Sequence, residues 1–447
     1  MSTALLTDHY ELTMVQAARA SGTAERRSVF ELFPRRLPEG RRYGVVAGVG
    51  RALRAIEEFR FEDADIDFLL TRKIVDDDLA QWLSNYKFSG SIWGYAEGEI
   101  YFPGSPLVVV ESSFQEAVLL ETLLLSIYNH DSAIASAASR MSAMADGRPL
   151  IEMGARRTQE YSAVAAARAA YVAGFTSTSN LEAGRRWDIP TSGTAAHSFT
   201  LLHDSEEEAF AAQLKTLGES TTLLVDTYDV EEAVRTGVRL TEGRLGAVRL
   251  DSGDLAIAAR EVRDLLDDLG AEQTRIIVTS DLDEWQIAAL RGAPVDGFGV
   301  GTSVVTGSGH PTCGFVYKLV SRADSADGEL LPVAKKSKNK NTVGGRKYAL
   351  RRRDERGVAE AEIVGIEAHP TSDGNDRPLH VLLVDNGEVV GHEPTSVGRE
   401  RHLAARAELP RAALRISKGE AAIPTIMLDD DGQSADNPYV RAPMPTV

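Results

Sequence analysis

The strongest constraint on the fold of this chain is a regular alternation of two patterns after about residue 130. Short apolar runs alternate with helical stretches in units of roughly 20–30 residues, which is typical of βα units around a parallel sheet. Seven of these runs end in polar, charged or glycine-rich residues, at 149–157, 171–180, 189–198, 222–229, 246–254, 275–283 and 294–303. Because parallel βα barrels carry their active sites at the carboxyl ends of the strands, we expect these seven ends to converge on one funnel.

The first part of the chain mixes helical and strand patterns. Amphipathic or capped stretches predict helices at 7–21, 52–59 and 76–86, and an apolar run predicts a strand at 27–34. Several short strand-like runs bounded by glycine and proline follow between residues 89 and 115. Residues 1–125 are therefore expected to form an α+β region.

The last part of the chain begins with a polar segment rich in glycine and lysine, residues 321–347, which predicts a long surface loop or hairpin. Strand-like runs follow at 361–368 and 380–390, and Asn386 with Gly387 gives a hairpin signal within the second run. From Asp429 onward the chain is acidic and proline-rich, and we expect it to lie over the surface.

Size and charge limit the classes of function. A chain of 447 residues exceeds the size of a single hydrophobic core, so two or three domains are expected. The 49 Lys and Arg against 66 Asp and Glu give a net charge of −17, which repels nucleic acid and anionic membranes. An anionic substrate would therefore need a local basic pocket.

The single cysteine, Cys313, has no intrachain partner for a disulfide, which fits a reducing compartment. The N-terminal residues lack the basic and apolar pattern of a signal peptide, and no run of about 18 apolar residues occurs. A cytoplasmic location without membrane spanning is the expectation.

Several strand ends carry charged residues. Arg249 and Asp251 stand two apart, so an extended strand points both side chains to the same face. With Asp281 they would place a cation and carboxylates at the funnel, able to hold ribose hydroxyls or Mg²⁺ through water. Aspartates before helices also serve as N-caps, and this is the role predicted for Asp226, Asp229 and Asp283.

The glycine-rich end at 297–303 offers backbone N–H groups that suit a phosphate, although such turns also arise for steric reasons alone. Arg156 and Arg157 follow the first strand end, where a guanidinium could hold a small planar carboxylate. A pair of adjacent arginines can equally be a solvated surface pair.

His197 follows the third strand end among small residues that would let a ligand approach. A histidine there could act as a general base, a metal ligand or a phosphoryl acceptor, or it could be structural. Because no second His or Cys stands at ligand spacing, the sequence predicts no protein-built zinc site.

Taken in order, the segments TDHYELTM, FELFPR, EMGARR, GFTSTSN, GTAAHSF, LLVDTYD, VRLDSGDL, SDLDE, GVGTS and VYKL resemble nicotinate phosphoribosyltransferases, over about residues 5–350. The resemblance implies an irregular parallel α/β barrel packed against an α/β sandwich domain formed by both ends of the chain. The corresponding division is an N-terminal domain over 1–128, the barrel over 129–320, and a returning C-terminal region over 321–447. It also implies a head-to-tail homodimer with shared active sites.

The implied reaction joins nicotinate to 5-phosphoribosyl-1-pyrophosphate, giving nicotinate mononucleotide and pyrophosphate in NAD salvage. In the family, ATP hydrolysis drives the reaction through a phosphohistidine, here His197, with Mg²⁺ as the cofactor. A phosphoimidazole beside the pyrophosphate would organise Mg²⁺ as charge develops on the ribose.

The resemblance also implies a role for individual residues. Tyr10 of the partner subunit would cover the pyridine ring, and Arg156 would bind the carboxylate. Arg249 and Asp251 would line the ring and ribose, and Asp281 would hold the ribose hydroxyls. Gly301, Thr302 and Ser303 would bind the 5′-phosphate. The basic loop from Lys335 to Lys340 would close over the phosphates.

Two positions bear on the choice of substrate. The related nicotinamide enzyme has an aspartate where Ser179 stands, and an aspartate would repel nicotinate whereas a serine would not. Met153 replaces an aromatic residue that many family members have before the glycine of the arginine motif, and its thioether can still pack on a ring.

Three other functions compete with this one. Quinolinate phosphoribosyltransferase shares the barrel plan but uses decarboxylation rather than ATP and lacks the histidine motif. A barrel that had lost catalysis would show a broken set of charged strand ends, whereas His197, Arg249, Asp251 and Asp281 are all present. A metal-dependent hydrolase or an aldolase would need paired histidines or a lysine at a strand end, and neither is seen on the predicted strands.

Overall fold

A computed structural model describes residues 2–335 and 342–439. The chain forms two compact units, one of Met1–Ser136 with His310–Val447 and the other of Ala137–Gly309. The family resemblance implied boundaries at 128/129 and 320/321. The second boundary falls earlier in the structure because the strand at 315–322 pairs with the strand at 27–34 of the first unit.

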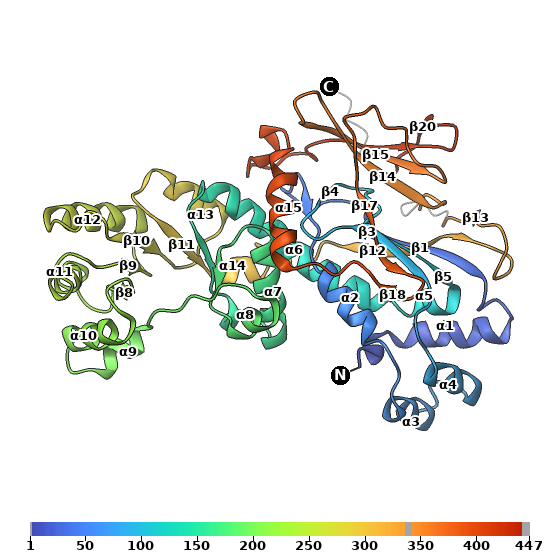
Figure 1. Cartoon of the computed structure of the whole chain (residues 1–447), viewed down its shortest axis with the longest axis horizontal. Helices are drawn as coiled ribbons and strands as arrows, with labels where there is room; N and C mark the ends of the chain where they lie inside the picture. The colour runs from blue at the N-terminus through green and yellow to red at the C-terminus, as the bar shows by residue number, and fades with distance from the viewer. Residues whose placement is uncertain (1, 336–341, 440–447) are drawn as a thin grey trace. The chain divides into compact units, whose positions relative to one another are not determined.

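The first unit is built on a seven-stranded sheet in the order β13-β12-β1-β5-β3-β17-β18 (Figure 1). Its strands are β1 (Arg27–Pro34), β3 (Ser91–Tyr95), β5 (Val108–Ser113), β12 (Phe315–Arg322), β13 (Leu331–Pro332), β17 (His380–Asp385) and β18 (Glu388–Val389). The predicted strand at 27–34 is confirmed as β1, which pairs antiparallel with β12 on one side and β5 on the other. N-terminal and C-terminal segments thus share one sheet.

A five-stranded sheet and a two-stranded ribbon complete the strands of this unit. They comprise β16 (Arg377–Pro378), β14 (Lys347–Arg353), β15 (Ala359–Ile366), β19 (Thr425–Leu428) and β20 (Ser434–Ala435), with β2 (Gly44–Val45) and β4 (Ile100–Tyr101). The predicted hairpin is confirmed as β17–β18, where Asn386 at φ 45° and Gly387 at φ 84° occupy the turn. Positive φ at both turn residues matches the twist of the flanking strands.

Helices cover the seven-stranded sheet and enclose the main core of the unit. They are α1 (His9–Ala20), α2 (Val49–Glu57), α3 (Asp63–Thr71), α4 (Asp77–Ser84), α5 (Phe114–Val118) and α15 (Thr395–Ala407), with α6 (Glu121–Ala145) continuing into the second unit. Short 3-10 turns lie at Ala4–Leu6 and Arg411–Leu414. In the core, Phe30 of β1 stacks on Tyr317 of β12 with ring centroids 5.0 Å apart.

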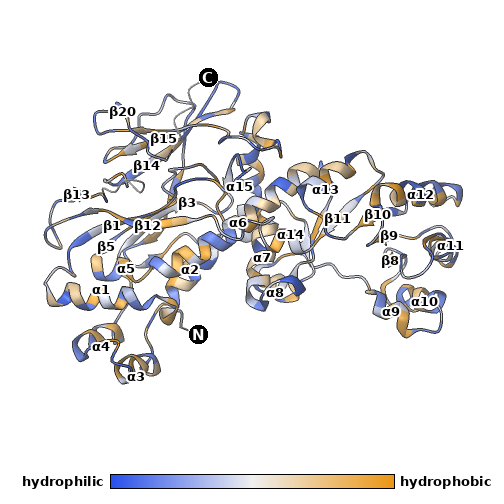
Figure 2. Ribbon diagram, turned by 180° about the vertical axis from the view of Figure 1, so that it is seen from behind, coloured by the Kyte–Doolittle hydropathy of each residue, from blue (hydrophilic) through white to orange (hydrophobic). Residues whose placement is uncertain are grey.

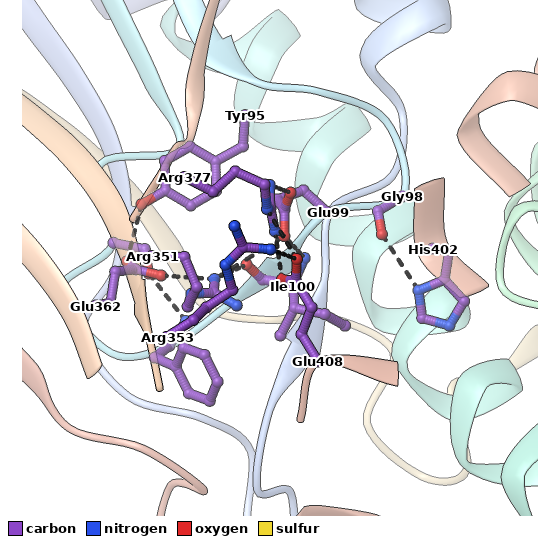
Figure 3. A network of polar contacts seen from close by, with 12 residues as sticks. Tyr95, Gly98, Glu99, Ile100, Arg351, Arg353, Glu362, Arg377, His402 and Glu408 are labelled. Carbon is purple, nitrogen blue, oxygen red and sulfur yellow. Dashed lines mark hydrogen bonds and ion pairs between the residues drawn. The ribbon is translucent and has the colours of Figure 1, made fainter. Parts of the chain in front are cut away.

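A buried network of charges joins the five-stranded sheet to the N-terminal half of this unit (Figure 3). Glu362 of β15 accepts hydrogen bonds from the Tyr95 hydroxyl at 2.8 Å and from Arg351 Nη2 at 2.9 Å. Glu99, just before β4, accepts one from Arg377 Nη1 at 2.6 Å. Segments more than 200 residues apart in the sequence are therefore tied by charged groups within the interior.

The second unit contains one parallel sheet in the order β7-β6-β11-β10-β9-β8. Its strands are β6 (Leu150–Glu152), β7 (Ser177–Thr178), β8 (Thr222–Leu224), β9 (Ala247–Leu250), β10 (Arg275–Val278) and β11 (Gly297–Val300). The predicted α/β class is confirmed, and the sheet is a curled half-barrel. Six of the seven predicted strand ends follow strands of this sheet.

The prediction of a strand at 189–198 is wrong. Thr191 makes only an isolated bridge to Thr178, and residues 192–196 have no regular structure. Pro190 has no N–H to give to a ladder, and Ile189 is the one residue of the run that is fully buried. Because it has so few apolar side chains to bury, this segment lies against the edge strand β7 without adding a strand to the sheet.

Helices alternate with the strands of this unit as the sequence pattern predicts. They are α7 (Glu160–Val172), α8 (Leu181–Trp187), α9 (His197–Leu202), α10 (Glu206–Leu217), α11 (Val230–Leu240), α12 (Leu255–Asp268), α13 (Glu284–Ala289) and α14 (Thr302–Val305), with 3-10 turns at Ala155–Arg157 and Leu290–Gly292. In Figure 2, α10, α11 and α12 carry both apolar and polar residues. In α11 the buried residues Ala233, Val234, Gly237 and Val238 recur at helical spacing and form its inner face.

None of the helices in residues 2–335 and 342–439 has a stretch long and apolar enough to cross a membrane.

Candidate active site

The carboxyl ends of the six parallel strands lie at one edge of the sheet of the second unit. The sheet order makes β8, β9 and β10 neighbours, so the residues that follow them are brought together. Asp226 follows β8, Asp251 follows β9, and Thr279 follows β10. These three strand ends therefore lie side by side at one edge of the sheet, and the segment that carries His197 is hydrogen-bonded to them.

His197 and Asp226 form a hydrogen-bonded pair. Nε2 of His197 lies 3.0 Å from Oδ1 of Asp226. The histidine side chain is 41% exposed and the aspartate side chain only 5% exposed, so the imidazole can meet a ligand while its partner cannot. His197 is the first residue of α9, and the residues before it are small, as the sequence indicated. This pair is the most specific chemical feature of the site.

Asp226 is held in its ionised form by several donors. Its Oδ2 accepts hydrogen bonds from the Asp251 backbone N–H at 2.9 Å and from the Ser252 hydroxyl at 2.8 Å. Burial by itself would raise the pKa of Asp226, but these hydrogen bonds and the one to His197 together hold it below its ordinary value. The carboxylate therefore accepts, and Nε2 of His197 carries the proton. In the tautomer that donates from Nε2, the lone pair lies on Nδ1.

The predicted role of Asp226 as a helix cap is wrong. Asp229, three residues later, caps α11 by accepting from the Glu232 N–H at 3.0 Å. The loop after β8 is long enough to leave Asp226 at the strand end and to bring the second aspartate to the helix. The predicted capping role of Asp283 is confirmed, since its Oδ1 accepts from the N–H groups of Trp285 and Gln286.

Arg249 and Asp251 are both fixed by threonines that the sequence did not single out. Nη1 of Arg249 donates to the Thr194 hydroxyl at 2.9 Å, which connects β9 to the segment before His197. Burial, with Arg156 nearby, lowers the pKa of Arg249 although Asp251 and Asp226 oppose this. Asp251 accepts a hydrogen bond from the Thr279 hydroxyl. Nε of Arg249 is buried and has no hydrogen-bond partner among the described residues.

Asp281 is exposed after β10. The preceding residue, Ser280, has φ 139°, a conformation that residues with a Cβ rarely adopt. Strain of this kind is costly and occurs preferentially at functional sites. The loop conformation at this strand end is therefore held by its surroundings.

Glu152 organises the ends of β6 and β7 and was not predicted. Its fully buried carboxylate accepts from the Gly154 N–H and from the Thr178 hydroxyl, each at 2.5 Å. Its backbone carbonyl accepts from the Ser179 N–H at 2.8 Å. Burial raises the pKa of Glu152, and the two hydrogen bonds only partly offset this effect. Ser179 therefore has a defined backbone position while its side chain is exposed.

The arginine motif and the glycine-rich end are adjacent. Arg156 is exposed beyond β6, and Met153 N–H donates to the Val300 carbonyl at 2.8 Å. Gly301 precedes the single turn α14, in which Thr302 is exposed and Ser303 is half-buried. The guanidinium predicted to hold a carboxylate and the predicted phosphate cradle thus follow two neighbouring strands of the same sheet.

Gly299 is required at the centre of this arrangement. A Cβ on Gly299 would lie 2.5 Å from Thr279 Cγ2 and 2.7 Å from Met153 Sδ. We expect Gly299→Ala to destabilise the protein by about 1–3 kcal/mol and to weaken ligand binding, because both neighbours must move. Urea unfolding and substrate KM would measure the two effects. Gly292→Ala is the control, since a Cβ there meets nothing within 4 Å; an equal loss in both variants would contradict the steric explanation.

The oxygen donors at these strand ends bear on whether the site can hold Mg²⁺. Among the residues that the structure describes, no group of three or more His, Cys, Asp or Glu side chains is arranged to hold a metal ion. Asp251 and Asp281 offer hard carboxylate oxygens at neighbouring strand ends. Mg²⁺ is commonly bound through one or two carboxylates with substrate phosphates and water supplying the rest, so these residues fit an ion that enters with a phosphorylated substrate.

Tyr10 lies in the first unit, on the first turn of α1, and is 45% exposed. Of the basic loop Lys335 to Lys340, all but Lys335 lies outside the described residues.

Comparison with known proteins places this chain in a family. The family model of the nicotinate phosphoribosyltransferase N-terminal domain matches residues 5–129. The chain is 53% identical over 430 residues to nicotinate phosphoribosyltransferase pncB1 of Mycobacterium tuberculosis, covering 94% of each chain. It is 38% identical over 361 residues to the nicotinate phosphoribosyltransferase of Bacillus subtilis, covering 78% of this chain and 73% of that protein.

The fold leads to the same family. Human nicotinic acid phosphoribosyltransferase matches with a TM-score of 0.81 and 25% identity, over 95% of this chain and 98% of the human chain. The resemblance drawn from the motifs is thus confirmed across nearly the whole sequence. The chain belongs to the nicotinate phosphoribosyltransferase family of enzymes.

Proposed function

We propose that this protein joins nicotinate to 5-phosphoribosyl-1-pyrophosphate and that ATP drives the reaction through phosphorylation of His197. The His197–Asp226 pair carries the proposal, because an exposed imidazole with a buried, ionised partner is suited to accept a phosphoryl group. The name of the 53% identical relative supports the choice of nicotinate. Quinolinate phosphoribosyltransferase, the alternative within the fold, needs no such histidine.

The pairing of Nε2 with Asp226 supports Nδ1 of His197 as the reacting nitrogen. Since Asp226 accepts from Nε2, the lone pair of Nδ1 attacks the terminal phosphorus of ATP, and the P–O bond to ADP breaks with its electron pair on the ADP oxygen. The resulting phosphoimidazole retains the Nε2 proton and gains positive charge on the ring. Asp226 lies 3.0 Å from that nitrogen and stabilises this charge. Water later releases the group as phosphate.

In the transfer step, the bond between ribose C1 and the pyrophosphate oxygen breaks with its electrons on the pyrophosphate, and the pyridine nitrogen supplies the pair for the new bond. Positive charge develops on the ribose during this exchange. Asp251 and Asp281 line the ribose and stabilise that charge, and Gly301, Thr302 and Ser303 hold the 5′-phosphate. Bound Mg²⁺ supplies charge neutralisation of the pyrophosphate.

Arg156 binds the nicotinate carboxylate, with Ser179 leaving room for the negative charge. Met153 and Arg249 contact the ring, and Tyr10 of the partner subunit covers its other face in a homodimer with shared sites. The product feeds NAD salvage, and we place the enzyme in the cytoplasm. The exposure of Arg156 and Ser179 at neighbouring strand ends supports this assignment.

The decisive experiment measures product from phosphoribosyl pyrophosphate with nicotinate, nicotinamide or quinolinate, each with and without ATP, for the wild type and His197→Ala. We expect mononucleotide from nicotinate, stimulated by ATP only when His197 is present, and ³²P from γ-labelled ATP on the wild-type protein alone. His203→Ala is the matched control, because the side chain of this neighbouring histidine contacts Phe199, with Nδ1 at 2.9 Å from the Phe199 carbonyl and its ring against the Phe199 ring. Product from none of the pyridines would refute the proposed function.

A further inference from the structure

A buried carboxylate, that of Glu284, connects two segments of the second unit beyond the strand ends. Glu284 is the first residue of α13, three residues after Asp281, and its side chain is only 1% exposed. Its Oε1 accepts a hydrogen bond from Nε of Arg140 at 2.9 Å, and its Oε2 accepts one from the Ser308 hydroxyl at 2.7 Å. The two oxygens of one acid therefore join the long helix α6 to the loop that follows α14.

Arg140 fixes the orientation of this acid. The arginine side chain is 8% exposed, and its guanidinium carbon lies 5.6 Å from the centre of the Trp285 ring. An arginine keeps its charge when buried, and its planar guanidinium restricts the directions from which it can bond a carboxylate. Burying such a pair costs desolvation energy that only good hydrogen-bond geometry offsets. The carboxylate of Glu284 is therefore held in one orientation toward Ser308.

Residues 302–308 form the α14 turn, which closes with a Schellman motif. The N–H of Gly307 donates to the Val304 carbonyl at 3.1 Å, and the N–H of Ser308 donates to the Ser303 carbonyl at 2.7 Å. The α14 turn contains Thr302 and Ser303, the proposed ligands of the 5′-phosphate. Because a helix of a single turn has almost no stability of its own, the position of Ser303 depends on how Ser308 is held.

Ser308 has an unusual backbone conformation for its residue type. Its φ is 50°, in the left-handed region, between Gly307 at φ 62° and Gly309 at φ 83°. A Cβ makes this region costly, and glycine would adopt it more readily. The serine therefore contributes its hydroxyl at this position and not backbone freedom. The hydrogen bond to Glu284 accounts for that hydroxyl.

We propose that Glu284 is a positioning residue that holds the α14 turn, through Ser308, at a fixed distance from the strand end that carries Asp281. The inference rests on the proposed function, in which Asp281 binds the ribose hydroxyls and Ser303 the 5′-phosphate. Glu284 and Ser308 touch no reacting atom. Because the groups that bind the ribose and its phosphate are tied to one acid, the site is ordered before phosphoribosyl pyrophosphate enters, and less entropy is lost on binding.

The test compares Ser308→Ala and Ser308→Gly with the wild type in steady-state kinetics and urea unfolding of the full chain. Both variants remove the hydroxyl and leave the pair of Arg140 and Glu284 intact. We expect each to raise the KM for phosphoribosyl pyrophosphate about five- to tenfold, because part of the energy of one hydrogen bond to a charged group is lost. The KM for nicotinate and kcat should change by less than about twofold, since the α14 turn holds only the phosphoribosyl group.

The glycine variant separates positioning from stability. Glycine relieves the left-handed strain at this position, so Ser308→Gly is expected to be more stable than Ser308→Ala. The two variants should nevertheless share the same raised KM for phosphoribosyl pyrophosphate, because both lack the hydroxyl. A KM that rises only in the less stable variant, or a wild-type KM in both, would overturn the inference.

Glu284→Gln completes a double-mutant cycle with Ser308→Ala. The amide keeps one oxygen for Arg140 and can turn its NH₂ group to the Ser308 hydroxyl, which also accepts hydrogen bonds. We therefore expect a rise in the KM for phosphoribosyl pyrophosphate of only about threefold in the wild-type background and less than about 1.5-fold in the Ser308→Ala background. Equal effects in the two backgrounds would show that Glu284 does not act through Ser308 and would overturn the inference.

Ser89→Ala is the matched control for the serine substitutions. The Ser89 hydroxyl also donates to a glutamate, with Oε1 of Glu116 at 3.0 Å, but this pair lies in the first unit. Both KM values of Ser89→Ala should equal those of the wild type. Wild-type protein that forms no nicotinate mononucleotide would instead overturn the proposed function, and this inference with it.

Discussion

Asp226→Asn is expected to lower ATP-driven mononucleotide formation by about 10²- to 10⁴-fold. The amide cannot carry the charge that stabilises the phosphoimidazole, and it can present its NH₂ group to Nε2, which would favour the tautomer with the proton on Nδ1. In the opposite orientation the NH₂ group would replace Oδ2 and face the Asp251 N–H, so that the hydrogen bond donated by this N–H would be lost. Rapid-quench measurement of phosphoenzyme formation would locate the defect at phosphoryl transfer.

Asp229→Asn is the matched control for this substitution. It makes the same chemical change three residues along the chain, and asparagine caps helices as well as aspartate does, so activity and stability should stay near wild type. Normal labelling of His197 in Asp226→Asn would show that the pairing of imidazole and carboxylate is not needed for phosphorylation. Loss of activity in both variants would point to a general effect of charge.

Glu362→Gln is expected to lower the free energy of unfolding by about 3–5 kcal/mol. Glu362 is fully buried and accepts hydrogen bonds from Arg351 Nη2 and from the Tyr95 hydroxyl (Figure 3). It also accepts one from the Ser105 hydroxyl. Among the described residues, the charge of Arg351 would then keep the Ile100 carbonyl, 2.8 Å from Nη2, and one distant carboxylate, that of Glu99 at 3.9 Å. An arginine cannot lose its proton to escape burial, so the full cost of the unpaired charge remains.

Arg351→Met should cost less, and its cost should depend on pH. Burial already raises the pKa of Glu362 above its ordinary value of 4.5, although Arg351 lowers it. Without the arginine this pKa rises further, and the folded protein binds a proton that the unfolded chain releases. Stability is then retained below pH 4.5 and is lost as the pH rises through the folded-state pKa. The deficit of Arg351→Met is therefore expected to be larger at about pH 8 than at about pH 5.

Urea unfolding of both variants at several pH values would measure these differences. Arg356→Met is the control, because Arg356 pairs with Asp354 on the surface with 84% of its side chain exposed, and little change is expected. A deficit for Arg351→Met that is independent of pH would contradict the idea that Glu362 takes up the proton.

Local patterns in the sequence determined most of the elements. Short apolar runs predicted β1 and the six strands of the parallel sheet, and capping aspartates marked the starts of α11 and α13. Asn386 and Gly387 predicted the β17–β18 hairpin. The sequence motifs also indicated the protein family. These features succeed because a strand, a cap or a tight turn depends on the chemistry of a few adjacent residues.

Only the tertiary structure determined which side chains are hydrogen-bonded to one another in the site. Asp226 and Asp229 both lie between a strand and a helix in the sequence. The length of the loop after β8 places Asp226 next to His197 and Asp229 at the N-terminus of α11. No local sequence pattern predicted the contacts of Glu152 and Thr194, because their bonding partners are close in space but distant in the sequence. The composition of residues 189–198 is compatible with a strand. A segment joins a sheet, however, only if it buries side chains against the sheet and forms backbone hydrogen bonds with a neighbouring strand. Local sequence therefore determined which chemistry each strand end brings, and the order of strands in the sheet determined which groups act together.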